Sequence, residues 1–199
     1  MKWYNKISSR TYALIAVLIV GSTALILYAM GQVPICKCGI IRLWHGVVFS
    51  SENSQHLSDW YTFTHIIHGF AFYFFFWLVG KRRGWPLWLC FVSAVLLESG
   101  WEMLENSDFI INRYREVTIS LDYFGDSVIN SVSDIFAMAF GFFLASRLRV
   151  WISLALVVTF EIMLGYYIHD NLIINIIMLI HPIEAIKNWQ TGGVAFPKL

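Results

Sequence analysis

The chain has 199 residues, of which 58% are hydrophobic, 17% aromatic and only 14% charged. A soluble domain is typically about 45–50% apolar and about 25% charged, so this composition excludes a disordered chain, a basic nucleic-acid-binding domain and an ordinary cytosolic globule. The formal net charge of +1 indicates no partner by itself, and the length permits a single domain over residues 1–199.

The chain contains several apolar runs long enough to cross a membrane. About 18 or more such residues span a hydrocarbon core of roughly 30 Å as a helix. The five runs are Tyr12–Met30, Asp59–Gly80, Trp85–Leu104, Asp126–Ser146 and Val150–His169. A sixth stretch, Asn171–Trp189, has an apolar part too short to cross, and it contains Pro182. We therefore predict an all-α polytopic membrane helix bundle with five transmembrane helices and a C-terminal interfacial or re-entrant helix.

The first run raises the question of a signal peptide. Its 19 apolar residues exceed the ~7–15 residues of a signal-peptide core, and no A-x-A cleavage site follows. We predict an uncleaved membrane anchor.

The basic residues predict the orientation of the bundle. Residues 1–10, 81–84 and 147–149 carry eight Lys and Arg and no Asp, Glu or His. Cytoplasmic connections are rich in Lys and Arg, so we expect these segments and the N-terminus inside the cell and the C-terminus outside.

Three cysteines are present. Cys36 and Cys38 form a C-x-C pair in the first outer loop, and Cys90 lies in the third run. A C-x-C pair rarely closes on itself without strain. The pair is either a local feature of the loop or, as two thiols, a weak signal for a soft metal.

Ionisable residues inside the runs are the most informative feature. Each costs about 2.5–3.5 kcal/mol at the bilayer centre even on the lenient insertion scale, so it needs a partner and commonly has a function. In each of four runs the polar residues have spacings that place them toward the outer side, mostly on one helix face: His65 and His68; Glu98, Glu102 and Glu105; Asp126, Asn130 and Asp134; Glu161, with His169 and Asp170 after it.

The helical rise sorts these residues into two layers. The deeper layer holds His68, Glu98, Asp134 and Glu161, and the shallower layer holds His65, Glu102, Glu105, Asp126, Asn130, His169 and Asp170. Since the inner half of the runs carries no acid or histidine, we expect a polar cavity that is open to the outside and closed toward the cytoplasm.

Imidazole and carboxylate groups from facing helices are typical of metal sites in helix bundles and suit Zn, Fe or Mn. We predict His65, His68, Glu98 and Glu102 as metal ligands. We predict Asp126, Asp134 and Glu161 as further ligands or the general base. Substrate-binding roles are predicted for Arg113, Arg115, Glu105, Asn130 and Asp170, where the two arginines would hold a phosphate head group.

Two other interpretations of the same residues stay open. Buried carboxylates carry protons or cations in transporters, although a transporter should also show polar groups or broken helices leading to the inner side. Alternatively, the polar groups hydrogen-bond the helices together in a structural partner of the cell envelope.

Long motifs in this chain resemble uncharacterised protein family 0314. They are Asn53-Ser-Gln-His-Leu-Ser-Asp-Trp-Tyr61, His65-Ile-Ile-His-Gly69, Glu98-Ser-Gly-Trp-Glu-Met-Leu-Glu-Asn106, Arg113-Tyr-Arg115, Asp122-Tyr-Phe-Gly-Asp-Ser-Val-Ile-Asn-Ser-Val-Ser-Asp134 and Asp170-Asn-Leu-Ile-Ile-Asn175. The resemblance covers Cys36 to Gln190. The chain differs from the family pattern at His169, where the family is associated with Arg. This difference argues against an essential role for His169. The resemblance implies a bacterial inner-membrane protein and implies no activity. Together with the orientation predicted from the basic residues, this location predicts a cytoplasmic N-terminus and a periplasmic C-terminus.

The combined hypothesis is a metal-dependent hydrolase or transferase whose partners are membrane lipids and not nucleic acid. Its substrate would be a lipid or a lipid-linked molecule of the outer leaflet.

Overall fold

The structure is a computed structural model that describes residues 2–118 and 122–192. In chain order its helices are η1 (Trp3–Lys6), α1 (Ser9–Ala29), α2 (Thr62–Lys81), α3 (Leu87–Glu105), α4 (Asp108–Val117), α5 (Val128–Arg147), α6 (Val150–Ile168), α7 (Leu172–Ile180) and α8 (Glu184–Gln190). Five of them (α1, α2, α3, α5 and α6) are long and apolar enough to cross a membrane. The predicted all-α class with five membrane-spanning helices is therefore confirmed.

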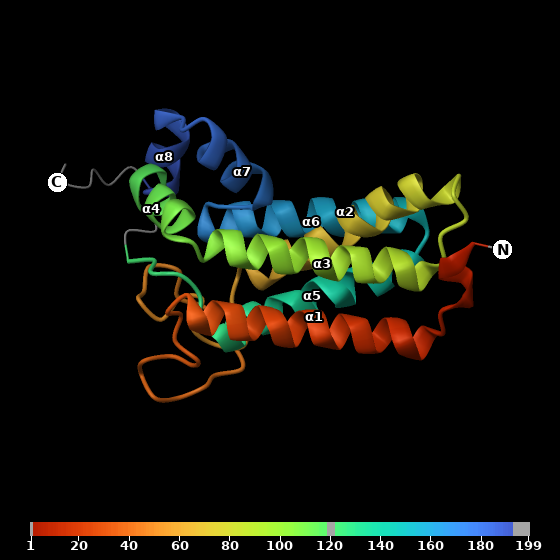
Figure 1. Ribbon diagram of the computed structural model, residues 1–199. Coiled ribbons are helices and arrows are strands. Elements are labelled where there is room, and N and C mark those ends of the chain that lie inside the picture. Colours follow the sequence, from red (N-terminus) through yellow and green to blue (C-terminus); the bar gives the residue numbers. More distant parts are fainter. Residues whose placement is uncertain (1, 119–121, 193–199) are drawn as a thin grey trace.

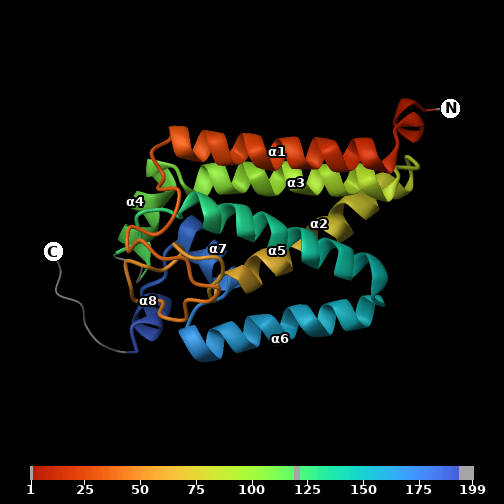
Figure 2. The ribbon, with the colours of Figure 1, turned by 90° about the horizontal axis from the view of Figure 1, so that it is seen from below.

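The five long helices form one bundle. Figure 2 shows α1 and α3 side by side at one edge, α6 at the opposite edge, and α2 and α5 crossing between them. Few residues of α6 are buried, as expected for a helix that faces lipid. Side chains of α1, α3 and α5, including Phe91, Val95, Met138 and Phe142, form an apolar core.

The contact between α2 and α5 depends on two glycines that face each other across the crossing. A β-carbon added at Gly69 would overlap the backbone oxygen of Met138, and one added at Gly141 would overlap the backbone oxygen of Ile66. The two backbones approach so closely because neither position carries a side chain, which is typical of membrane helix pairs.

The basic connections lie together at one end of the bundle. The α2–α3 turn and the α5–α6 turn both lie at the end that carries η1, while α4, α7 and α8 lie at the other end (Figure 1). Lys2 Nζ and Tyr4 OH both donate to the backbone oxygen of Arg83, at 2.7 and 2.5 Å, and so join η1 to the α2–α3 turn.

One prediction about the helices near the other end requires correction, and one helix there was not predicted. A single helix over Asn171–Trp189 is wrong, because the chain leaves the helix at His181 (φ −142°, ψ 92°) and starts α8 at Glu184. Pro182 is the cause, since proline lacks an N–H and disfavours helical geometry at the residue before it. Helix α4 was not predicted, and it follows α3 after a short turn at Asn106 and Ser107.

Candidate functional site

The polar residues gather where the N-terminal halves of α2 and α5 meet the C-terminal half of α3. Glu98 and Glu102 are fully buried, and Asp134 of α5 is 3% exposed. The apolar core of α1, α3 and α5 lies between this cluster and the basic end of the bundle. The expected polar region near one end of the bundle is therefore present.

Both histidines of α2 face Glu98 of α3. His65 Nδ1 lies 2.6 Å from Glu98 Oε1, and His68 Nδ1 lies 3.0 Å from Glu98 Oε2. In the neutral tautomer that carries its proton on Nε2, each imidazole keeps a lone pair on Nδ1. Each Nδ1 and the neighbouring Glu98 oxygen can then act together as ligands of one ion.

Glu102 lies one turn after Glu98 and has no comparable partners. Neither of its carboxylate oxygens accepts a hydrogen bond from any residue that the structure describes, and Oε1 lies 3.5 Å from His65 Nδ1. Burying an unpaired carboxylate is costly. The arrangement therefore favours a cation beside Glu102.

The spacing of these groups suits a metal ion. One nitrogen of each histidine and one oxygen of Glu98 lie within 4.8 Å of one another, and the same holds for one atom each of His65, Glu102 and Glu105. Ligands about 2.0–2.2 Å from one ion can be no more than roughly 4.4 Å apart. The distances of 2.6, 3.0 and 3.5 Å given above meet that limit.

Asp134 connects this cluster to the start of α2. Its Oδ2 lies 3.9 Å from His65 Nε2, and its Oδ1 accepts from the hydroxyl of Thr62 at 3.1 Å. The same hydroxyl accepts from the backbone N–H of Asp59 at 3.1 Å. Burial raises the pKa of Asp59, although hydrogen bonds such as the one from the backbone N–H of Tyr61 oppose the shift. Asp134 is thus near the histidines and lies outside the set of four predicted ligands.

Asp126 is fixed in a separate hydrogen-bonded group. Asn106 Nδ2 donates to Asp126 Oδ2 at 3.1 Å, while the Asp126 backbone N–H donates to Asn106 Oδ1 at 2.6 Å. The hydroxyl of Tyr123 donates to Asp126 Oδ1 at 3.0 Å. Burial raises the pKa of Asp126 to about 6 despite these bonds. The group joins the end of α3 to the loop before α5.

Glu161 is placed at the start of α7. Its Oε1 accepts from the backbone N–H of Leu172 at 3.2 Å, and its Oε2 accepts from that of Ile173 at 3.3 Å. A carboxylate at this position satisfies free amide groups and interacts favourably with the helix dipole. Within the described part of the chain, no hydrogen bond or ion pair joins Glu161 to either histidine of α2.

The arginines predicted to bind phosphate contact backbone carbonyls instead of lying free. Arg113 Nε donates to the oxygen of Leu179 on α7 at 3.1 Å, and Arg115 Nε donates to that of Tyr123 at 2.7 Å. Both are half-buried. They brace α4 against α7 and the loop before α5.

The other predicted substrate-binding residues lie near the cluster, with different surroundings. Glu105 Oε1 accepts from Tyr114 OH at 3.1 Å, and Asp170 Oδ2 accepts from Tyr61 OH at 3.1 Å. Both carboxylates line one polar hollow. Burial raises the pKa of Asp170 to about 7. Asn130 instead donates to a backbone oxygen of the loop before α2 at 2.8 Å, so its amide anchors that loop.

The tyrosines at this end of the bundle were not predicted. Tyr61, Tyr114 and Tyr123 all line the polar hollow with Glu105 and Asp170. A tyrosine in an apolar sequence is uninformative by itself. The one available signal was the amphipathic pattern of residues 108–117, which places Tyr114 on the buried face of α4.

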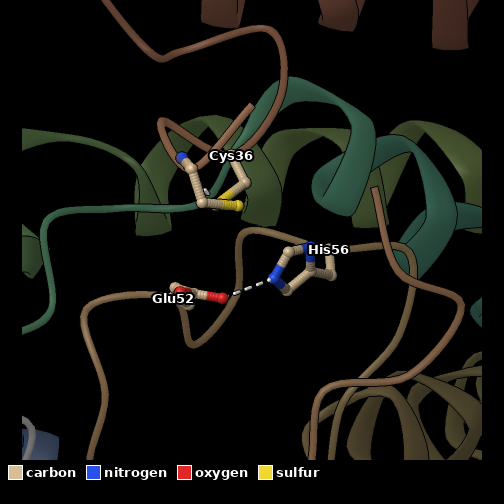
Figure 3. A group of neighbouring side chains, drawn as sticks. Cys36, Glu52 and His56 are labelled. Atoms are coloured by element: carbon tan, nitrogen blue, oxygen red, sulfur yellow. Dashed lines mark hydrogen bonds and ion pairs between the residues drawn. A yellow bond between two sulfur atoms is a disulfide. The ribbon is translucent and has the colours of Figure 1, made fainter. Parts of the chain in front are cut away.

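A second group of metal-ligating side chains lies in the outer loop. Cys36 and Cys38 form a disulfide with Cα atoms 5.2 Å apart, a closure that is rare for a C-x-C pair. Figure 3 shows Cys36 near His56 and Glu52. His56 Nε2 pairs with Glu52 Oε2 at 3.1 Å, while its Nδ1 accepts from the backbone N–H of Arg42 at 3.3 Å.

This loop group is a poor metal site. Both nitrogens of His56 are engaged, and the guanidinium of Arg42 lies 3.1 Å from the same Glu52 oxygen. The hydrogen bond with His56 lowers the pKa of Glu52, so the carboxylate stays ionised as a partner for the Arg42 guanidinium. The group instead closes the loop.

We expect the double variant Cys36→Ser/Cys38→Ser to keep whatever metal the wild type binds. In the wild type, thiol labelling of the unfolded protein should find about one free thiol per chain without reductant, from Cys90. After reduction, the same labelling should find about three. Mass spectrometry counts the labels. Three labels without reductant would show that the disulfide does not form.

The chain matches the family model described as "Protein of unknown function (DUF2585)" over residues 27–192. A UPF0314 protein of Paracoccus denitrificans (strain Pd 1222) is 54% identical over 177 residues, which are 88% of this chain and 90% of the relative. A UPF0314 protein of Sphingopyxis alaskensis is 51% identical over 186 residues, covering 93% and 97% of the two chains. A UPF0314 protein of Rhizobium etli (strain CIAT 652) is 56% identical over 167 residues, 84% of each chain. No solved structure matches this chain significantly.

Proposed function

The chain belongs to the DUF2585 family, whose relatives named above are UPF0314 proteins, and from this premise we propose that it is a metal-dependent enzyme of the bacterial inner membrane. The expected membership in family 0314 is thus confirmed. The proposed metal ligands are His65, His68, Glu98 and Glu102. The observation that carries the proposal is the buried carboxylate of Glu102, which has no hydrogen-bond partner in the described chain and lies 3.5 Å from His65 Nδ1.

Charge balance supports a divalent cation in this place. Glu98, Glu102 and Asp134 are all at most 3% exposed. If all three were ionised, even two protonated histidines would leave one negative charge uncompensated. Zn, Fe or Mn bound to imidazole and carboxylate groups would supply positive charge where it is missing.

A metal in such a site acts as a Lewis acid and lowers the pKa of a bound water to about 7, which suits hydrolysis or group transfer. Asp134 is the proposed general base. Its Oδ2 lies 3.9 Å from His65 Nε2, outside the proposed ligand set, and the hydroxyl of Thr62 fixes its other oxygen.

The orientation of the bundle supports a substrate from the outer leaflet. Lys81 and Arg147 end α2 and α5, and Arg83 lies in the α2–α3 turn, all at the end opposite to the cluster. Such residues favour the cytoplasmic side. The Cys36–Cys38 disulfide lies at the end of the cluster, and disulfides persist in the oxidising periplasm. The proposed centre therefore faces the periplasm, where it would act on a lipid or a lipid-linked molecule.

Elemental analysis of the detergent-purified, untagged protein tests the metal centre. We expect about one equivalent of Zn, Fe or Mn per chain in the wild type and most of it to be lost in His68→Ala and Glu102→Gln. The matched control is His181→Ala, which changes an exposed histidine between α7 and α8 and should keep the metal.

Circular dichroism and gel filtration establish that each variant is folded. Folded wild-type protein without metal would overturn the proposed function and would leave a hydrogen-bonded structural network or a proton-carrying role. Metal that stays in both site variants would place the ion elsewhere.

A further inference from the structure

A polar hollow lies next to the proposed metal centre, at the end of the bundle that carries α4 and α7. Its volume is about 40 Å³, room for a small polar group, and it is partly open to the surroundings. The walls come from five parts of the chain and include Asn53, Tyr61, Glu105, Tyr114, Asp170 and Asn175. We call it the outer hollow.

The outer hollow presents an excess of hydrogen-bond acceptors. Two of its hydroxyl groups donate to its own carboxylates, from Tyr61 to Asp170 and from Tyr114 to Glu105, each at 3.1 Å. The hydroxyls of Tyr123 and Thr118 donate to Asp126 and to the backbone oxygen of Tyr114. The amide nitrogen of Asn175 also donates to Asp170, at 3.3 Å. These bonds leave few wall donors for a ligand.

Two buried acceptors of the wall are unused. The amide oxygens Asn53 Oδ1 and Asn175 Oδ1 are inaccessible to solvent and receive no hydrogen bond from any residue of the described chain. Because Asn175 Nδ2 is fixed by its bond to Asp170, its oxygen cannot be exchanged for the nitrogen by a simple flip. Leaving such acceptors unpaired costs free energy, so the hollow fits a ligand that donates several hydrogen bonds.

The charge and the aromatic rings of the hollow favour a cation. Two carboxylates, Glu105 and Asp170, belong to its wall, and no Lys, Arg or His is among the wall residues that the structure describes. The rings of Tyr114 and Tyr123 meet edge to face, with centroids 5.5 Å apart. Tyrosine rings attract ammonium groups through their faces.

We propose that the outer hollow binds a primary ammonium group, R–NH₃⁺, as found in an ethanolamine lipid head group or a free amine. A primary ammonium has three N–H donors, which match the two unused amide oxygens and a carboxylate. A quaternary ammonium such as choline has no N–H and would leave Asn53 and Asn175 unsatisfied.

The outer hollow continues toward the metal centre. A second hollow shares Tyr61, Glu105, Tyr114 and Asn175 with it and is lined in addition by His65 and His68 and by Leu172 and Leu179 of α7. A head group in the outer hollow would therefore lie beside the histidines, with apolar side chains of α7 available to an acyl chain. The part of the inference that makes this molecule a substrate rests on the proposed function, whereas the binding of the ammonium group does not.

Calorimetric titration of the wild-type protein in detergent with glycerophosphoethanolamine and glycerophosphocholine tests the proposal. The two probes carry the same phosphate and differ at the nitrogen. We expect the ethanolamine compound to bind at least about tenfold more tightly, as one or more lost hydrogen bonds imply. Equal affinities, or no binding of either compound or of free ethanolamine, would overturn the proposal.

Two variants test whether ethanolamine binds in the outer hollow. Asn53→Leu removes an unused amide oxygen and should weaken ethanolamine binding about tenfold. Asn112→Leu changes an exposed amide on α4 and should leave the affinity unchanged. Equal loss in both variants, or in neither, would contradict the assignment.

Two further experiments distinguish a lipid ligand from a free amine, and the metal proposal from the amine proposal. A short-chain phosphatidylethanolamine that binds more tightly than free ethanolamine identifies a lipid, whereas equal affinity identifies a free amine. His68 does not line the outer hollow, so His68→Ala should still bind ethanolamine after losing the metal. Binding without metal in the wild type would overturn only the proposed function, and a metal without amine binding would overturn only this inference.

Discussion

Gly69→Ala and Gly141→Ala are each expected to destabilise the protein by about 3 kcal/mol or more, which is the upper range for overpacking. The β-carbon added at Gly69 would overlap the backbone oxygen of Met138, and that added at Gly141 would overlap the backbone oxygen of Ile66. A backbone atom cannot rotate away as a side chain can, so α2 and α5 would have to separate. We expect the melting temperature in detergent to fall by roughly 6–12 °C.

The chain contains matched controls for this experiment. Gly21 lies in α1 and Gly100 in α3, and a β-carbon at either position would have no atom within 4 Å. Because alanine favours the helix by up to about 1 kcal/mol over glycine, Gly21→Ala and Gly100→Ala should leave the melting temperature unchanged or raised. Equal melting temperatures for Gly69→Ala and Gly100→Ala would refute the close crossing of α2 and α5.

The crossing also matters for the site, because it sets the distance between α2 and α5 near the metal centre. His65 lies one turn before Gly69, and Asp134 lies two turns before Gly141. Any separation of the two backbones would lengthen the 3.9 Å distance between His65 Nε2 and Asp134 Oδ2. We therefore expect folded Gly69→Ala protein to lose metal as well as stability.

The sequence predicts the five long helices well because length and hydropathy suffice to define a membrane span. It fails where local chemistry decides. Helix α4 is short and amphipathic, so a search for apolar runs does not detect it. The single helix expected over Asn171–Trp189 ignored that Pro182 forces His181 out of helical geometry.

The sequence also predicted the candidate site only in part. Helical spacing predicted that His65 and His68 share a face, and the structure places both against Glu98. Depth along a helix does not reveal which way a side chain turns. Glu161 and Glu98 therefore fall in the same predicted layer. In the structure the Glu161 carboxylate accepts hydrogen bonds from the first backbone amides of α7. The sequence did not define the start of that helix well.

Asp170 should make the protein less stable as the pH rises. Burial raises its pKa from 3.8 to about 7, so the folded state holds a proton that the unfolded state has released between about pH 4 and pH 7. The contribution is fully present below pH 4, is lost progressively up to pH 7 and then stays constant. Three pH units correspond to at most about 4 kcal/mol, or roughly 8–16 °C in melting temperature.

The variant Asp170→Asn isolates this contribution, because an amide cannot ionise. Melting temperatures measured by tryptophan fluorescence from pH 4 to pH 8 should fall less steeply for Asp170→Asn than for the wild type. Asp108→Asn changes an exposed carboxylate at the start of α4 and should reproduce the wild-type slope. Equal slopes for all three proteins would mean that Asp170 ionises normally in the folded state.

This titration also gives the outer hollow a signature that a structural carboxylate would lack. A primary ammonium beside Asp170 stabilises the charged carboxylate and so lowers its pKa. Saturating ethanolamine should therefore raise the wild-type melting temperature more at pH 8 than at pH 5, because only the ionised form gains the interaction. In Asp170→Asn this pH-dependent part should disappear, even if the amide oxygens of Asn53 and Asn175 still bind the amine. Since ligand binding and proton binding at one site are linked, an ethanolamine effect of equal size at both pH values would place the amine away from Asp170.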